Sequence, residues 1–312
     1  MSVSQPSLIA NCTHRCNLEC PHCYCSGSPS NTSRLSQNDL ASAFNDLSDF
    51  SLNHPPFFDL TGGEFVLLDD ADAISQMVRK KFPNTCIIVE TNGIELLNGT
   101  DKYDRIEFDR IHLSVDRLHT TLFADGTSPV LKEALKYRDN RRFELVINYI
   151  PELNEVEMPS SIAIARASGI RVNVFPYDTL ARIGRGSTLR ANGPGVSVAD
   201  NPGFFRCELG EALFLDGNKN WYLCHFPTKE TDLGRIGSPG LSDRYQEALK
   251  SKSYRSLRSE GLPSVYRELS SEINGRIGSN PMGRLFHNRC EPCLLLQDKG
   301  LITFVGDHNG TD

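Results

Sequence analysis

Apolar runs alternate with amphipathic segments through the first 180 residues of this 312-residue chain. Short runs rich in β-branched and aromatic residues predict six strands, which begin at Ser7, Phe57, Thr85, Arg110, Arg142 and Arg171. Helical periodicity between them predicts helices from Ser36 and over residues 70–81, 129–136 and 160–168, with Asp39 completing a capping box on Ser36. Six strand–helix units predict a parallel sheet and an α/β fold of the (β/α)6 partial TIM barrel type.

Polar residues follow most of the predicted strands. The first strand is followed by Cys16, Cys20 and Cys23, the second by TGGE at residues 61–64 and the third by TNG at residues 91–93. Ser114 and Asp116 close the fourth strand, and Asn148 lies late in the fifth. Because the carboxyl ends of parallel strands meet at one edge of a sheet, we expect these residues to form one site.

The pattern changes after residue 180, where the glycine-rich stretch ARIGRGSTLRANGPG interrupts the strand–helix alternation. We therefore predict a barrel over residues 1–180, a linker over 181–206 and a small C-terminal domain over 207–312. Residues 241–270 have a helical pattern and predict a helical insertion in this last domain.

Charge and hydropathy exclude several classes of partner. The chain has 33 basic and 39 acidic residues, and its net charge of -6 predicts neither a nucleic acid nor an anionic membrane as partner. The N-terminus has no secretory signal pattern, and no apolar stretch is long enough to cross a bilayer. We expect a cytoplasmic protein, in which ten cysteines indicate metal ligands or catalytic thiols rather than disulfides.

The stretch CNLECPHCYC concentrates four of these cysteines within ten residues. The spacing of Cys16, Cys20 and Cys23 in a loop allows three thiolates to serve one centre. A structural zinc ion takes four protein ligands, whereas a 4Fe–4S cluster with three cysteines keeps one iron open for a substrate or cofactor. Cys25 is a candidate fourth ligand.

A second set consists of Cys207, Cys224, Cys290 and Cys293. Four cysteines suit a closed tetrahedral site, and their spacing alone fits either zinc or an iron–sulfur cluster. A contrasting hypothesis is a non-enzymatic zinc-binding protein in which all of these cysteines are structural. That hypothesis predicts a colourless protein that oxygen does not damage.

The Cys16-x3-Cys20-x2-Cys23 motif, with His22 before its third cysteine, resembles the signature of the radical SAM superfamily. TGGE and the SVD at residues 114–116 strengthen this resemblance. It implies that the three cysteines hold a 4Fe–4S cluster whose open iron binds S-adenosylmethionine (SAM). Such enzymes cleave SAM to a 5′-deoxyadenosyl radical that removes a hydrogen atom from the substrate, with electrons from an external donor such as flavodoxin or ferredoxin.

The same resemblance implies roles for several other residues. Gly62, Gly63 and Glu64 are expected to line the amino group of SAM, and the carboxylate of Glu64 suits that group chemically. Ser114 and Asp116 are expected to meet the ribose hydroxyls, and His22 to lie beside the adenine. Asn148 and one of Arg182 and Arg185 are further candidates for binding polar groups of the cofactor, whereas His119 is expected at the surface.

The second set of cysteines, placed beside such a core, resembles the shortened auxiliary-cluster domain called twitch, a relative of the SPASM domain. This resemblance implies one auxiliary 4Fe–4S cluster that Cys207, Cys224, Cys290 and Cys293 ligate fully. A fully ligated cluster suits electron transfer or a structural role.

In overall pattern the chain resembles radical SAM peptide epimerases of ribosomal peptide pathways. In those enzymes a cysteine directly after the second auxiliary ligand donates a hydrogen atom, whereas here His225 follows Cys224. We therefore predict an oxidation or cross-link of a ribosomally made peptide. The alternative is an epimerase in which Cys12, Cys25 or Cys86 donates the hydrogen.

The substrate is less constrained than the cofactor. The first predicted strand begins within about ten residues of Met1, so we expect no separate leader-binding domain before it. A peptide would then be bound directly by the barrel, and a small molecule such as a sugar or an aminocyclitol, oxidised by a dehydrogenase, is the other alternative.

Overall fold

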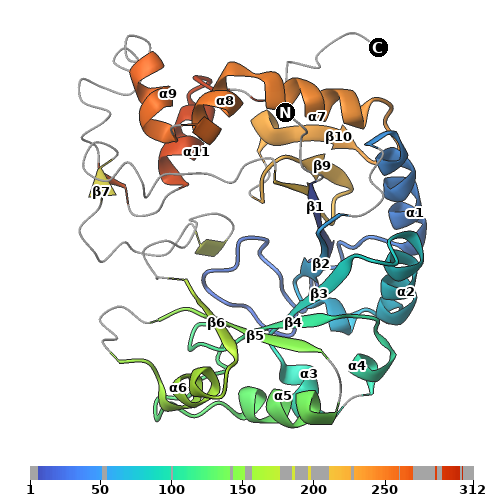
Figure 1. Cartoon of the computed structure of the whole chain (residues 1–312), viewed down its shortest axis with the longest axis vertical. Coiled ribbons are helices and arrows are strands. Elements are labelled where there is room, and N and C mark those ends of the chain that lie inside the picture. The colour runs from blue at the N-terminus through green and yellow to red at the C-terminus, as the bar shows by residue number, and fades with distance from the viewer. Residues whose placement is uncertain are drawn as a thin grey trace.

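One curved sheet of nine strands organises the described part of the chain, in the order β10-β9-β8-β1-β2-β3-β4-β5-β6 (Figure 1). The structure is a computed structural model. It describes residues 6–50, 55–99, 101–140, 143–151, 157–175, 185–186, 196–197, 211–225, 228–259, 261–269, 285–286, 290–302 and 304.

The six predicted strands form the parallel half of this sheet. They are β1 (Ser7–Thr13), β2 (Phe57–Gly62), β3 (Cys86–Thr91), β4 (Arg110–Ser114), β5 (Glu144–Tyr149) and β6 (Arg171–Val174). Each pairs in parallel with the next along the chain. The prediction of a parallel α/β core is confirmed, and all six carboxyl ends lie at one edge of the sheet.

Helices cover the outer, convex side of the sheet, while the loop after β1 lies inside its curve (Figure 1). The helices between the parallel strands are α1 (Gln37–Asp46), α2 (Ala71–Lys81), α3 (Ile94–Leu97), α4 (Lys102–Arg105), α5 (Pro129–Asn140) and α6 (Ser160–Ala167). Short 3-10 helices η1 (Leu47–Phe50) and η2 (Phe65–Leu67) follow α1 and β2. The side chain of Ser36 accepts a hydrogen bond from the N–H of Asp39, whose carboxylate accepts the N–H of Ser36, so the predicted capping box is confirmed.

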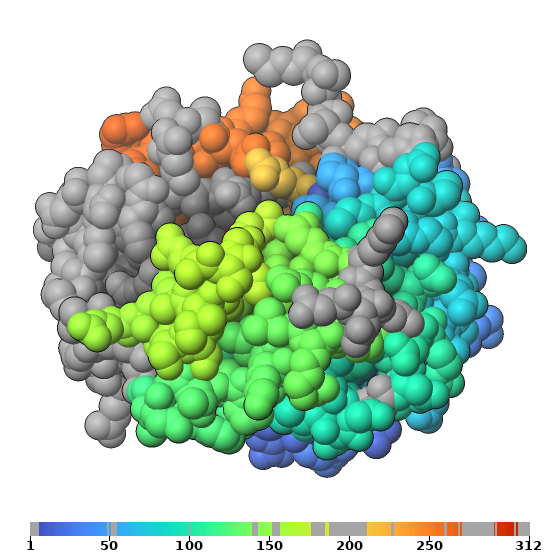
Figure 2. Space-filling model, turned by 60° about the horizontal axis from the view of Figure 1, so that its bottom comes forward, coloured from blue at the N-terminus to red at the C-terminus, as the bar shows by residue number. Residues whose placement is uncertain are grey.

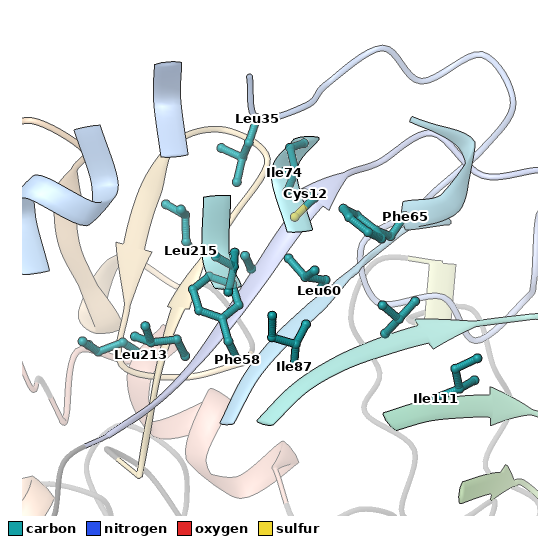
Figure 3. Close-up of a cluster of buried hydrophobic side chains, with 14 of the residues drawn as sticks. Cys12, Leu35, Phe58, Leu60, Phe65, Ile74, Ile87, Ile111, Leu213 and Leu215 are labelled. Carbon is teal, nitrogen blue, oxygen red and sulfur yellow. The ribbon is translucent and has the colours of Figure 1, made fainter. Parts of the chain in front are cut away.

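The hydrophobic core lies between the sheet and these helices (Figure 3). Phe58 and Leu60 of β2 point into it, together with Cys12 of β1 and Ile87 of β3. Because side chains alternate along a strand, the residues between them face the inside of the curved sheet. The inner face is therefore available for polar side chains.

Three further strands continue the same sheet beyond β1. They are β8 (Ala212–Leu215), β9 (Asn220–Tyr222) and β10 (Asp232–Arg235), and β8 pairs in parallel with residues 7–10 of β1. The indole N–H of Trp221 also donates a hydrogen bond to Asp46 at the end of α1, at 3.0 Å. The sheet thus crosses the domain boundary predicted at residue 206. Nearly all of the predicted linker, residues 181–206, lies outside the described residues.

The remaining elements are short and mainly helical. They are β7 (Val196–Ser197) paired with β11 (Leu285–Phe286), η6 (Lys229–Thr231), α7 (Leu241–Lys250), α8 (Lys252–Ser259), α9 (Leu262–Glu268) and α11 (Glu291–Asp298). Figure 2 shows the molecule turned so that the bottom of Figure 1 comes forward, where α5 and α6 form much of the surface in green and yellow-green. In the described part of the chain, every helix is too short or too polar to span a membrane.

Candidate active site

The four clustered cysteines lie in the loop that follows β1, which we call the cysteine loop (residues 14–28). The loop folds back on itself, because the N–H of Cys16 donates to the carbonyl of Ser28 and the N–H of Ser28 donates to that of His14. Main-chain N–H groups also point at sulfur atoms: Leu18 donates to Cys16 Sγ at 3.4 Å and Gly27 donates to Cys23 Sγ at 3.3 Å. Such donors favour thiolates over thiols.

The thiols of the loop are close enough to change one another's pKa. Burial, with a smaller contribution from neighbouring cysteines, raises the pKa of Cys16 to about 11 and that of Cys20 to about 12. Cys23 has its pKa lowered to about 6, chiefly by a hydrogen bond from Cys25, whose Sγ lies 3.5 Å away. Cys23 is therefore the readiest thiolate of the loop.

Among the described residues, no group of three or more His, Cys, Asp or Glu side chains is arranged so that it could hold a metal ion. A single zinc ion requires its ligands to converge on one point. A 4Fe–4S cluster has a different requirement, because each cysteine binds a different iron atom. Cys16, Cys20 and Cys23 of the cysteine loop could supply three such ligands.

Gly62 and Gly63 join the end of β2 to the cysteine loop. The N–H of Gly63 donates to the carbonyl of Thr13 at 2.6 Å, and that of Glu64 donates to the carbonyl of Arg15 at 2.9 Å. A Cβ at Gly62 would lie 2.2 Å from the Thr13 carbonyl oxygen, and one at Gly63 would lie 2.3 Å from that of Arg15. The two glycines are required because only a backbone without side chains fits against the loop.

Glu64 is consequently held beside the loop with its side chain buried. One carboxylate oxygen, Oε2, accepts the N–H of Asn92 at 2.9 Å, whereas the buried Oε1 has no hydrogen-bond partner. Burial raises the pKa of Glu64 to about 7, despite the hydrogen bonds that lower it. A buried carboxylate oxygen without a partner can accept a hydrogen bond from a ligand, such as the amino group of SAM that is predicted to bind here.

Asn92, whose individual role was not predicted, links Glu64 to the cysteine loop. Its side-chain amide donates to Asn17 Oδ1 at 2.8 Å and lies 3.9 Å from Cys16 Sγ, while its main-chain N–H holds Glu64. The sequence alone marks TNG as a polar stretch after a strand. The asparagine within it could be singled out only once the loop and the strand end were placed together.

Arg185, which follows the last barrel strand in the sequence, forms hydrogen bonds with the cysteine loop. Its guanidinium donates to the carbonyls of Cys20 at 2.9 Å and Gly27 at 2.7 Å, and its own N–H donates to the carbonyl of Cys23 at 3.0 Å. Its positive charge lowers the pKa of all three motif cysteines. Its contacts are with the loop itself, and Arg182 lies outside the described residues.

His22, His119 and Asp116 form a second polar group beside the loop. Both carboxylate oxygens of Asp116 lie 2.7 Å from His119, one from its N–H and the other from its ring Nδ1. The ring of His119 meets that of His22 edge-on, with 4.4 Å between centroids, so His119 is not the surface residue that was expected. Burial, with the nearby His119, lowers the pKa of His22 to about 4, so its ring is neutral.

Ser114 and Asn148 lie side by side at the carboxyl ends of β4 and β5. The side-chain oxygen of Asn148 accepts a hydrogen bond from Asn173 on β6 at 3.0 Å. Both residues occupy the predicted edge, and the roles of Ser114, Asp116, Asn148 and His22 toward a cofactor stay predictions.

His225, in the second half of the chain, contacts the cysteine loop. Its ring packs on that of Tyr24 with centroids 4.3 Å apart, and on Phe214 of β8 at 5.0 Å. The hydroxyl of Tyr24 donates to Asn11 of β1 at 2.7 Å. The residue after Cys224 is thus in contact with the residue after Cys23.

Comparison with known proteins identifies the family. The family model described as the radical SAM superfamily matches residues 10–173, more than half of the chain. The chain belongs to the radical SAM superfamily. Members of this superfamily use a 4Fe–4S cluster and SAM, and the matched residues contain the cysteine loop, the whole of β2 to β5 and part of β1 and β6.

Individual relatives extend this similarity over parts of the chain. Pre-heme d1 synthase of Dinoroseobacter shibae is 28% identical over 193 residues, covering 60% of this chain and 46% of that protein. The antilisterial bacteriocin subtilosin biosynthesis protein AlbA of Bacillus subtilis is 36% identical over 81 residues, covering 26% and 17%. The chain therefore matches less than half the length of these curated relatives.

Solved structures support the fold. Streptococcus suis SuiB, crystallised with the precursor peptide SuiA, matches with a TM-score of 0.57 at 13% identity, covering 82% of this chain and 67% of that chain. At this identity the match concerns the fold alone, and it agrees with a radical SAM partial barrel.

The candidate hydrogen donors lie in three different places in this radical SAM fold. Cys12 is fully buried in the core behind the sheet, among Leu60 and Phe65 (Figure 3). Cys86 begins β3, at the edge opposite the cysteine loop. Of the three, Cys25 alone lies in the cysteine loop at the carboxyl ends of the strands, where its Sγ is 3.7 Å from the carbonyl oxygen of Gly62.

The predicted auxiliary ligands are partly described. Cys224 follows β9, Cys290 caps α11 and Cys293 lies in the first turn of α11, while Cys207 lies outside the described residues. Gln297 of α11 connects this helix to the segment that follows Cys224. Its side-chain NH2 donates to Cys293 Sγ at 3.2 Å, and its side-chain oxygen accepts a hydrogen bond from the hydroxyl of Thr228. The ligand set of a second cluster stays a prediction.

Proposed function

We propose that this radical SAM protein cleaves SAM reductively and removes a hydrogen atom from a ribosomally made peptide, leading to an oxidation or a cross-link. The observation that carries the first part is the joining of the Gly62–Glu64 segment to the cysteine loop. It places Glu64, whose buried Oε1 has no hydrogen-bond partner, beside the loop that carries the three cysteines.

The residues divide this task among themselves. Cys16, Cys20 and Cys23 would hold the 4Fe–4S cluster, which supplies the electron that cleaves SAM. Glu64 would accept a hydrogen bond from the amino group of SAM and so fix its orientation. Arg185 keeps the loop in place through its three hydrogen bonds to loop carbonyls.

An oxidative outcome removes two hydrogens from the peptide. One leaves as a hydrogen atom to the 5′-deoxyadenosyl group, and the other leaves as a proton and an electron. A second 4Fe–4S cluster held by Cys207, Cys224, Cys290 and Cys293 would take that electron. The contact of His225 with Tyr24 supports this role, because it brings the segment of Cys224 against the cysteine loop.

Peptide substrates are supported by two relatives. AlbA is named for the biosynthesis of the bacteriocin subtilosin, and SuiB binds the precursor peptide SuiA. The experiment is to incubate the anaerobically reconstituted protein with SAM, a one-electron reductant and short peptides encoded beside its gene, in deuterated water. An oxidation or cross-link gives a peptide that has lost two hydrogen atoms. No change in any such peptide, while SAM is cleaved, would contradict a peptide substrate.

Epimerisation is a second candidate, favoured by the position of Cys25. Its thiol could return a hydrogen atom to a substrate radical, leaving a sulfur radical that a one-electron donor must reduce. Epimerisation predicts that the peptide keeps its hydrogen count and gains one deuterium, and that Cys25→Ser abolishes this exchange. An exchange that persists in Cys25→Ser would exclude Cys25 as the donor.

A further inference from the structure

Two carboxyl groups face the inside of the curved sheet. On β2, Phe58 and Leu60 point into the core, so Asp59 between them points to the inner face (Figure 3). On β3, Val89 belongs to the core, so Glu90 points inward as well. The strands pair in parallel, and the two carboxyl groups are close enough that Glu90 raises the pKa of Asp59.

Glu90 is accessible although it lies within a central strand. Its side chain is 35% exposed, and because helices cover the outer side, water reaches it from the inside of the sheet. One oxygen accepts the hydroxyl of Thr61 at 2.8 Å, and the other lies 3.6 Å from His112 Nδ1. Burial alone would raise the pKa of Glu90, but His112 and Thr61 outweigh it and hold that pKa below its usual value, so Glu90 carries a negative charge.

Asp59 is more deeply buried than Glu90, and one of its carboxyl oxygens lacks a hydrogen-bond partner. It is 6% exposed, and its Oδ1 has no hydrogen-bond partner. Burial, followed by the charge of Glu90, raises its pKa well above the usual value. Within the described ranges, no lysine or arginine forms an ion pair with either Asp59 or Glu90. The buried carboxyl of Asp59 lies beside the charge of Glu90 without a lysine or arginine to balance it, which is costly, and a bound cation would relieve that cost.

The pair also lies near the segment that joins β2 to the cysteine loop. Thr61, the hydrogen-bond partner of Glu90, directly precedes Gly62 and pairs across the sheet with Asn11. Asn11 accepts the hydroxyl of Tyr24 in the cysteine loop. Glu90 therefore lies level with Thr61, next to the Gly62–Glu64 segment, and Asp59 lies two residues before Thr61 on the same inner face.

From these observations we infer that Asp59 and Glu90 form a subsite for a cationic group of the substrate, a primary ammonium or a guanidinium. A lysine or arginine side chain of a peptide carries such a group, and so does an amino sugar. This inference rests on the proposed function, because it assumes that the substrate enters the barrel beside SAM.

The test compares charged and neutral forms of two probes by calorimetry, using the anaerobically reconstituted protein with saturating SAM. The peptide pair is acetyl-Gly-Lys-Gly-amide and the same peptide acetylated on the lysine side chain. The sugar pair is glucosamine and N-acetylglucosamine. We expect the charged member of one pair to bind roughly tenfold more tightly than its neutral form, and which pair shows this preference identifies the source of the cation.

Variants locate the preference. Glu90→Gln and Asp59→Asn should each weaken binding of the charged probe roughly tenfold and leave the neutral probe unaffected. Glu144→Gln is the matched control, because this carboxylate is 45% exposed and pairs with Arg110 at the opposite edge of the sheet. Equal binding of charged and neutral probes, no binding of either charged probe, or an unchanged preference in both inner-face variants would overturn the inference.

Two further readouts separate the possible failures. If Glu90 only braces His112, Glu90→Gln should lower the melting temperature while the charge preference stays, which counts against the subsite. Formation of 5′-deoxyadenosine is measured on the same samples. SAM cleavage without any charge preference would remove this inference and leave the proposed function standing, whereas absence of SAM cleavage would remove the proposed function itself.

Discussion

Replacing Glu64 by glutamine should weaken SAM binding and leave the fold intact. The side chain is only 1% exposed, and the amide oxygen of glutamine can still accept the N–H of Asn92. At the position of the orphaned Oε1, however, glutamine presents an NH2 group, which cannot accept a hydrogen bond from the amino group of SAM. The substitution therefore removes one charge-assisted hydrogen bond.

The magnitude follows from the burial of this group. A hydrogen bond to a charged partner contributes about 1.5–3 kcal/mol, and about 2 kcal/mol corresponds to a roughly 30-fold increase in the dissociation constant of SAM. The assay is equilibrium binding of SAM to the anaerobically reconstituted protein. The perturbation of the cluster's electron paramagnetic resonance signal by SAM provides a second readout.

The pH dependence gives an independent check on the same group. Burial raises the pKa of Glu64 to about 7, so the carboxylate that SAM requires is present above this pH and is protonated below it. The advantage of the wild type over Glu64→Gln should therefore shrink as the pH falls below about 7, until the two proteins bind SAM equally. A dissociation constant within threefold of the wild type, or an advantage that does not change with pH, would refute the assigned role of Glu64.

Three further changes test other parts of the structure. Arg185→Gln should lower both the amount of iron retained after reconstitution and the midpoint potential of the cluster, because a positive charge beside the cluster is lost. Arg185→Lys should keep the midpoint potential of the wild type. Arg110→Gln, at the opposite edge of the sheet, is the control and should match the wild type. Cys293→Ala should reduce the iron content from about eight to about four atoms per chain and leave SAM cleavage in place, so loss of the SAM-dependent signal would refute the assignment of this cysteine. Leu60→Ala, in the fully buried core, should lower the free energy of unfolding by about 2–5 kcal/mol in denaturant titrations, whereas Leu97→Ala, at a side chain 45% exposed, should have little effect.

Much of the fold could be predicted because the signals are local. Each predicted strand begins within two residues of an observed one, and the capping box at Ser36 marks the start of α1. The pairing of β8 with β1 could not be predicted in this way, because it joins residues 212–215 to residues 7–10 and depends on no local pattern. For the same reason, the sheet was expected to end with the sixth strand.

In the candidate site, too, features with a local sequence pattern could be predicted, whereas features that depend on long-range contacts could not. The cysteine motif and TGGE carry their own spacing, so their meeting at one edge of the sheet could be anticipated. Asn92 and Arg185 were harder to identify, because their importance comes from hydrogen bonds to a loop that is distant in sequence. His119 was expected at the surface, and only the folded chain brings its ring against His22.

The formation of 5′-deoxyadenosine from SAM is the most direct test of the central claim. The wild-type protein, reconstituted with iron and sulfide and supplied with a one-electron reductant, should produce 5′-deoxyadenosine and methionine. Cys20→Ala should produce neither, while Cys86→Ala, at the opposite edge of the sheet, should behave as the wild type. Equal production by Cys20→Ala, or none by the fully reconstituted wild type, would contradict the claim that the cysteine loop holds a cluster that cleaves SAM.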